Sequence, residues 1–240
     1  PGRIKNWKKE KVNALLNSLS FMQNDQLPSA NTSFLKESQL SGIWRSYYIA
    51  TDKDRLSNKE ALATGGELSY TSSEFLNTKA NISLFSTNAL YTPGVNVDGS
   101  VLSGGGNKDN INVLGIANLE FSTKHNTLIL GRQKLATPLM HHKTVRMIPT
   151  TFEGLTVDSK YDFASFKVAA ITKMKQRYDH LFYNLGDHVF KDNSKNSVLF
   201  ANITKKIDTL KIALWDYEFA SVMSAQYLQL DYKYNSISFA

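Results

Sequence analysis

The sequence predicts an all-β protein, a transmembrane, antiparallel, up-and-down β-barrel. About ten segments alternate apolar and polar residues, so each predicted strand has one apolar and one polar face. Most of these segments run to about 9–13 residues, the length of a tilted membrane strand, whereas soluble strands average about 5–6. Aromatic residues gather near the segment ends, as in the girdles of membrane barrels. They are Tyr47, Tyr48, Tyr70, Phe121, Tyr161, Tyr232 and Tyr234.

Residues 1–36 are expected to form an extension that precedes the barrel. Four apolar residues in this stretch, Val12, Leu15, Leu16 and Leu19, have helical spacing. They predict a short amphipathic helix, which is compatible both with an ordinary surface helix and with membrane contact. The stretch does not resemble a signal peptide, because polar residues interrupt its apolar centre.

Residues 37–240 are expected to form the barrel domain. The alternation predicts strands, in order, at 40–50, 64–70, 79–87, 112–121, 127–133, 152–157, 163–175, 197–204, 210–219 and 225–234. The connections differ in length: turns such as 122–127 and 158–162 are short, whereas 51–60, 87–110 and 177–195 are long and polar or glycine-rich. Short turns at one end and long loops at the other describe an up-and-down meander.

The composition fits this fold class and excludes several others. The chain has 240 residues, of which 42% are hydrophobic, and it has no cysteine. Disulfides, thiol nucleophiles and cysteine-bound zinc are therefore excluded. The mean hydropathy is −0.31, and no window approaches the roughly 18 apolar residues of a spanning helix. The net charge of +7 indicates anionic partners such as lipopolysaccharide, nucleic acid or small acids.

The stretch from Gly131 to Gly154, "GRQKLATPLMHHKTVRMIPTTFEG", is too long for a hairpin turn and contains two of the five prolines. With "GIWRSYY" and "ATGGELSY" before it and "LWDYEF" after it, this stretch resembles the OprD-type outer-membrane porins. The order and spacing of these motifs agree with that family from about residue 39 to residue 234. The first 35 or so residues resemble nothing recognised.

The resemblance implies an eighteen-stranded barrel that admits small solutes, often amino acids or small carboxylates, through a narrow eyelet. It also implies that residues 134–152 fold inward as the constriction loop. Arg132 and Arg146 would be pore-facing guanidinium groups, and Arg45 would lie further along the wall. Such groups stay charged and grip carboxylates at two points, and Pro138 and Pro149 would stiffen the loop.

The chain departs from the family pattern in two respects. Acidic residues usually precede the Arg-Met segment, but here His141, His142 and Lys143 stand there. The expected constriction is therefore more basic, which favours anionic solutes. Eighteen strands also need on the order of 400 residues, whereas 240 supply about ten strands. The expectation is a fragment that covers the N-terminal half of a longer barrel, with a smaller closed barrel as the alternative.

The predicted function is passive diffusion of small anionic or carboxylate-bearing solutes through a Gram-negative outer membrane. Lys167 is expected on the pore wall with the basic residues named above. We expect no catalytic residues and no cofactor. We also expect no metal, because His141 and His142 lack a third ligand nearby. Expected partners are solutes, outer-membrane lipid and lipopolysaccharide, not nucleic acid, in a monomer or trimer.

Two alternatives remain open from the sequence. A secreted, soluble β-sandwich that binds other molecules would bury Ile82, Val168, Leu228 and Leu230 inside, whereas a barrel would turn them outward to lipid. An outer-membrane barrel hydrolase would need a Ser/His pair facing the same side near the rim, and no motif of that kind is evident.

Overall fold

The computed structural model describes residues 37–53, 56–91, 110–143, 146–186, 197–219, 222–234 and 237–239. Within them the chain is built from β-strands: β1 (Gln39–Lys53), β2 (Leu56–Thr71), β3 (Thr78–Tyr91), β4 (Ile111–Ser122), β5 (Asn126–Gln133), β6 (Thr151–Lys160), β7 (Ser165–Lys175), β8 (Tyr183–Asn184), β9 (Val198–Ile207), β10 (Leu210–Phe219), β11 (Met223–Tyr234) and β12 (Ile237–Phe239).

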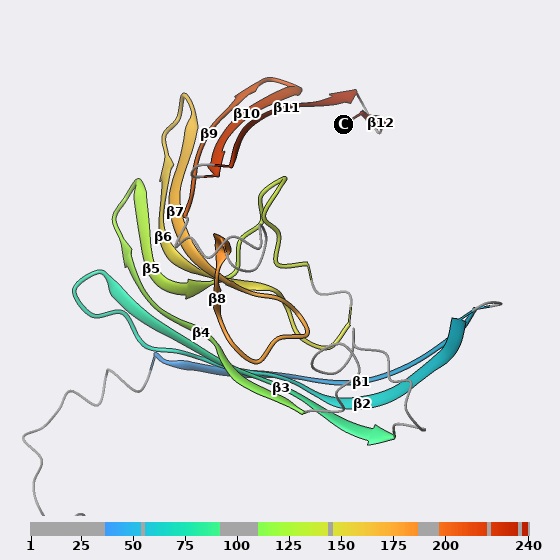
Figure 1. The fold of residues 1–240 in the computed structure, drawn as a ribbon. Coiled ribbons are helices and arrows are strands. Elements are labelled where there is room, and N and C mark those ends of the chain that lie inside the picture. The colour runs from blue at the N-terminus through green and yellow to red at the C-terminus, as the bar shows by residue number, and fades with distance from the viewer. Residues whose placement is uncertain are drawn as a thin grey trace, which may run out of the picture.

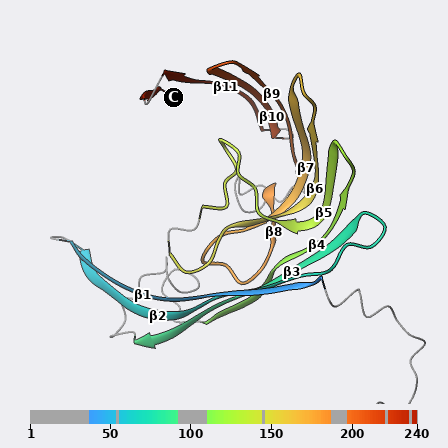
Figure 2. The same ribbon diagram turned by 180° about the vertical axis from the view of Figure 1, so that it is seen from behind.

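All twelve strands belong to one antiparallel sheet. Each strand pairs with its neighbour in sequence, in the order β1 to β7 and then β9 to β12, while β8 pairs with the end of β7. The sheet curls into a wall that is C-shaped in section, as Figures 1 and 2 show from opposite sides. Strands β1 and β12 are the two edges of this wall. The predicted all-β, up-and-down topology is confirmed.

The ten predicted strands correspond to β1–β7 and β9–β11, whereas the short β8 and β12 were not predicted. The prediction of a long loop at 51–60 is wrong. β1 and β2 extend through it on both sides of residues 54–55. The predicted helix in residues 1–36 lies outside the described residues. In the described part of the chain, no helix is long and apolar enough to cross a membrane.

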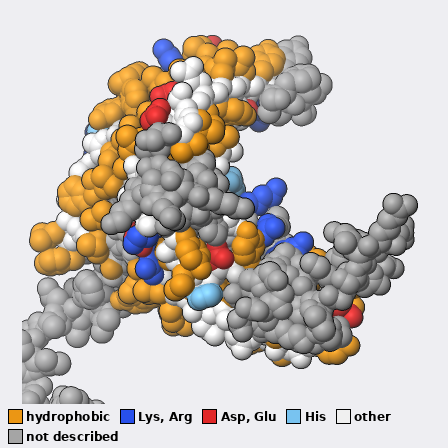
Figure 3. All heavy atoms as spheres, in the orientation of Figure 1, with side chains coloured by type: hydrophobic (Ala, Val, Ile, Leu, Met, Phe, Trp, Pro, Cys, Tyr) orange, Lys and Arg blue, Asp and Glu red, His pale blue; other side chains and the backbone are white. Residues whose placement is uncertain are grey.

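The outer, convex face of the sheet is apolar. Paired residues on neighbouring strands share a face, and rows of leucine run across the sheet in this way: Leu68 pairs with Leu84, Leu119 with Leu130, and Leu214 with Leu228. The residues that discriminate between the two fold classes are exposed on this face: Ile82 44%, Val168 48%, Leu228 59% and Leu230 52%. Figure 3 shows hydrophobic side chains along the outside of the curve. The β-sandwich alternative is therefore wrong.

Aromatic side chains cluster at the end of the sheet with the short turns. The rings of His125 and Tyr161 stack at 5.1 Å, and Phe163 contacts both Tyr161 and Phe166 at 5.7 and 6.0 Å between centroids. Phe163 is 64% exposed and Tyr161 40% exposed. Amphipathic rings of this kind at one level of the wall are typical of the aromatic girdle at a membrane interface.

Candidate pore constriction

The described part of the connection between β5 and β6, residues 134–143 and 146–150, lies on the concave side of the sheet (Figure 1). We call it the inward segment. It is held by apolar contacts at both ends. Leu135 and Met140 belong to a buried cluster with the ends of β6, β7, β9 and β10, and Met147 and Ile148 belong to a second cluster with β2, β3 and β4. The inward segment therefore crosses the concavity from one part of the wall to another.

Strand β10 explains why the first cluster lies inside the wall. Trp215, Tyr217 and Phe219 point to the concave face, where Phe200 on β9 packs against the first two at 6.1 and 5.5 Å. Asp216 and Glu218 point to the other side and are exposed. This polarity is the reverse of that in the leucine rows. The apolar residues face inward here because the inward segment covers them.

Phe85 on β3 is the centre of the second cluster and is 1% exposed. Its ring crosses β4 at Gly115, where a Cβ would lie 2.1 Å from the ring. The ammonium groups of Lys134 and Lys175 lie 5.7 and 5.6 Å from the centroid of this ring. Cations at this distance are attracted by the ring face. Phe85 therefore joins the wall to the two ends of the inward segment.

Two lysines fix the ends of the inward segment by polar contacts. Lys134 forms an ion pair with Glu67 on β2, with 2.8 Å between Nζ and Oε1. Lys175 is fully buried, and its Nζ donates to the carbonyl oxygens of Pro149 and Gln176, each at 3.0 Å. The exit of the segment is thus tied to the end of β7. Neither lysine was predicted to have this role.

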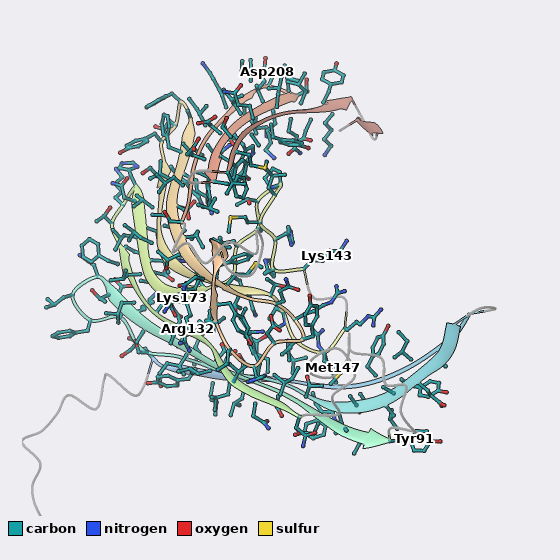
Figure 4. The ribbon with its side chains drawn as sticks, viewed as in Figure 1. Tyr91, Arg132, Lys143, Met147, Lys173 and Asp208 are labelled. Carbon is teal, nitrogen blue, oxygen red and sulfur yellow. The ribbon has the colours of Figure 1, made fainter. Side chains whose placement is uncertain are left out.

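Arg45 and Arg146, both predicted as site residues, lie together. Arg45 Nη1 on β1 donates to the carbonyl oxygen of Arg146 at 2.9 Å, across 101 residues of sequence. Among the described residues Arg45 has no carboxylate partner. Lys143 is exposed on the inward segment, and Figure 4 shows it directed toward the open side of the curve. The Arg45 guanidinium therefore ties the inward segment to β1, and Lys143 adds an exposed cation elsewhere on the same segment.

His141 and His142 shape the inward segment. Their rings stack at 4.9 Å, and His142 Nδ1 lies 2.6 Å from the carbonyl oxygen of Leu135. His141 Nδ1 accepts a hydrogen bond from the backbone N–H of Lys143. No group of three or more potential metal ligands occurs among the described residues. The two rings close a turn that presents Lys143.

The rest of the concave wall is polar. Ser69 on β2 bonds to Ser83 on β3 at 2.7 Å, and Asn81 on β3 bonds to Asn118 on β4 at 3.0 Å. Two of the lysines on this face are paired: Lys167 lies 3.0 Å from Asp158, and Lys211 lies 3.1 Å from Asp231. Lys167 therefore lies on the concave face, and Asp158 compensates its charge.

The structure corrects the position of Arg132. Arg132 lies two residues after Leu130 on β5, so the two side chains share the outer face. Their partners on β6, Glu153 and Leu155, are also two residues apart and lie on the same face. Its Nε forms an ion pair with Glu153 at 2.9 Å, and Lys173 contacts the same carboxylate at 3.0 Å. Arg132 thus lies on the outside of the wall and does not face the concavity. Two leucines at i−2 and i−4, Leu130 and Leu128, are the sequence signal that indicates this position.

A pocket of about 460 Å³ opens between the inward segment and the connection that follows β7. Its apolar lining includes Phe152, Met174 and Phe219, and its polar lining includes His141 and Arg177. This volume is in the range of pockets that hold small organic molecules. The combination of apolar and basic groups suits an organic anion.

Comparisons with known proteins agree with this architecture. Residues 32–238 match the family model described as outer membrane porin, OprD family. OccD3 (OpdP) of Pseudomonas aeruginosa is 19% identical with a TM-score of 0.65 and covers 85% of this chain and 47% of its own length. OpdK of P. aeruginosa, solved with vanillate, is 17% identical with a TM-score of 0.70 and covers 84% and 54%.

A BenF-like porin from Pseudomonas fluorescens Pf-5 is 16% identical, with a TM-score of 0.72, and covers 83% of this chain and 54% of its own length. The chain therefore spans about half the length of these porins. No curated protein sequence is similar enough to the chain to count as a match.

Proposed function

Because the chain belongs to the OprD family of outer membrane porins of Gram-negative bacteria, we propose that its protein is a passive channel for small anionic solutes. The inward segment would narrow this channel from one side of the wall. The observation that carries the anionic preference is the contact of Arg45 with the backbone of Arg146 in the inward segment, on which Lys143 is also exposed.

The physical basis is a difference in charge compensation along the concave face. Lys134, Lys167 and Lys211 each have a carboxylate within 3.1 Å, so their contribution to the potential is largely cancelled. Arg45 and Lys143 have no such partner in the described part of the chain. Charged groups that line a pore set its ion selectivity. The field of a charge with no paired counter-charge extends over about 8–10 Å at ordinary ionic strength before salt screens it.

Small organic carboxylates are the proposed solutes. A guanidinium group can hold a carboxylate at two points, and the pocket beside the inward segment adds apolar contacts to basic ones. OpdK, which has the same fold, was solved with vanillate, an aromatic carboxylate, and this supports the proposed class. No step in this function requires a cofactor or covalent chemistry.

The test is single-channel recording in a planar bilayer, with the reversal potential measured under a salt gradient. We expect discrete conductance steps with a preference for anions. Arg45→Gln keeps a donor for the carbonyl oxygen of Arg146 but removes the charge, so it should reduce that preference. Lys124→Gln, at an exposed turn at the opposite end of the sheet, is the matched control and should leave it unchanged.

A folded, inserted protein that shows no conductance steps would overturn the channel. Steps with a cation preference in the wild type would overturn the anionic solutes but not the channel. The two parts of the proposal are thus tested separately in one recording.

A further inference from the structure

A groove of about 740 Å³ runs along the outer face of the wall across β4, β5, β6 and β7. Its floor consists of small residues, Ala117, Gly131, Gly154 and Ala170, and leucines at 114, 130 and 155 form its sides. The floor requires glycine where strands approach closely: a Cβ on Gly154 would lie 2.2 Å from the carbonyl oxygen of Ala170. The groove is therefore a built feature of the sheet.

One end of the groove carries charge. Arg132 and Glu153 belong to its lining, and Lys173 contacts the same Glu153 carboxylate. Two cations share one anion, so this group of three side chains has a net charge of one positive unit. The Arg132 guanidinium also donates to the carbonyl oxygen of Leu114 at 3.0 Å and lies 4.2 Å from the centre of the Phe182 ring. These contacts fix its position beside the groove.

The charged end faces the rim of the wall that has the long connections. β5 ends at Gln133, and its last pair with β4 is Ala117–Arg132, while β4 continues to pair with β3 as far as Ile111. The wall is low at this point. In Figure 4 Arg132 and Lys173 lie next to each other there. In barrels of this kind the long connections are external, which places the cations at the level of outer-leaflet headgroups.

Energetics favour that level. A cation on the lipid-facing side is strongly destabilising at the bilayer midplane but costs little near the interface. An uncompensated positive unit at the interface attracts an anionic headgroup. The apolar groove continues directly from this charge, so one amphiphile can contact both parts.

We propose that this groove binds an anionic lipid of the outer leaflet. One acyl chain lies along Gly131, Gly154 and Ala170, and the lipid phosphate is held by Arg132 and Lys173. The site is on the opposite side of the wall from the pore, so the proposal is independent of the solute preference proposed above.

The test is native mass spectrometry of the protein folded in detergent, delipidated and titrated with lipid A or with zwitterionic phosphatidylethanolamine. Lipid A should bind more tightly than phosphatidylethanolamine. Lys173→Gln should weaken lipid A binding about fivefold, because one cation near the surface contributes about 1 kcal/mol. Ala170→Phe should weaken it about tenfold or more, since two displaced methylenes cost about 1.6 kcal/mol.

Ala201→Phe is the matched control for the groove, because Ala201 is exposed on the same outer face but outside the groove lining. Lys79→Gln is the control for charge, because Lys79 forms an exposed pair with Glu74 at 3.3 Å near the short turns. Each variant is first shown to be folded by its heat-dependent migration in gels.

Equal binding of the two lipids, or equal effects of groove and control variants, would overturn the proposal. A change in the number of copies per complex caused by Ala170→Phe, with lipid A binding unchanged, would also overturn it. That result would identify the groove as a contact between barrels.

Discussion

Replacing Phe85 by alanine should destabilise the protein by about 3–5 kcal/mol, the usual cost of removing a buried phenyl ring, and should raise the single-channel conductance. Phe85 is 1% exposed, and Met147 and Ile148 of the inward segment belong to the cluster around it. The ring faces the lumen side of the wall, so its removal exposes apolar surface to water and not to lipid.

The conductance should rise because Phe85 contacts both attachments of the inward segment. Without the ring, Lys134 and Lys175 lose the aromatic face that lies between them. The second apolar cluster then no longer fixes the segment against β2, β3 and β4, and the channel is less narrowed. Urea unfolding in lipid vesicles, followed by tryptophan fluorescence, measures the stability, and planar-bilayer recording measures the conductance.

Phe163→Ala is the matched control. Phe163 is 64% exposed among the rings near the short turns, and it does not belong to either apolar cluster of the inward segment. It should change the conductance little. If Phe85→Ala lowers the stability while the conductance and its noise stay at the wild-type level, the inward segment does not narrow the pore.

The strands could be predicted from the sequence because their two faces meet different solvents. Lipid outside and water inside impose a period of two, and this period is visible in Ala80, Ile82 and Leu84 against Asn81 and Ser83. The same rule places Arg132 outside with Leu128 and Leu130. Motif resemblance placed it in the pore, so the local pattern was the better guide there.

The attachments of the inward segment could not be predicted in the same way. Lys175 ends an alternating strand, and its place in that pattern is that of an exposed polar residue. Its side chain is nevertheless fully buried, and its ammonium group donates to the carbonyl oxygen of a proline 26 residues away. The contact between Arg45 and Arg146 joins residues 101 apart. Long-range contacts of this kind depend on the curvature of the sheet, which no local pattern encodes.

The reversed polarity of β10 has the same origin. Trp215, Tyr217 and Phe219 face the lumen side although they are apolar, because Leu135 and Met140 of the inward segment cover them. A sequence pattern records which residues share a face, but it does not record whether another segment covers that face. The site is therefore assembled from a regular wall and an irregular segment, and only the wall follows from periodicity.

Replacing Lys143 by glutamate should shift the ion selectivity toward cations, and more strongly at low salt. The substitution changes the charge by two units at an exposed position of the inward segment, the segment whose Arg146 backbone contacts Arg45. Its effect should fall as ionic strength rises, because the screening length drops from about 30 Å at 0.01 M to about 3 Å at 1 M. The reversal potential, measured at several salt concentrations with a constant gradient, checks both the sign and the salt dependence.

Lys124→Glu makes the same change of charge in an exposed turn at the other end of the sheet and should have a smaller effect. Equal shifts for the two variants would show that selectivity depends on the total charge of the wall and not on the inward segment.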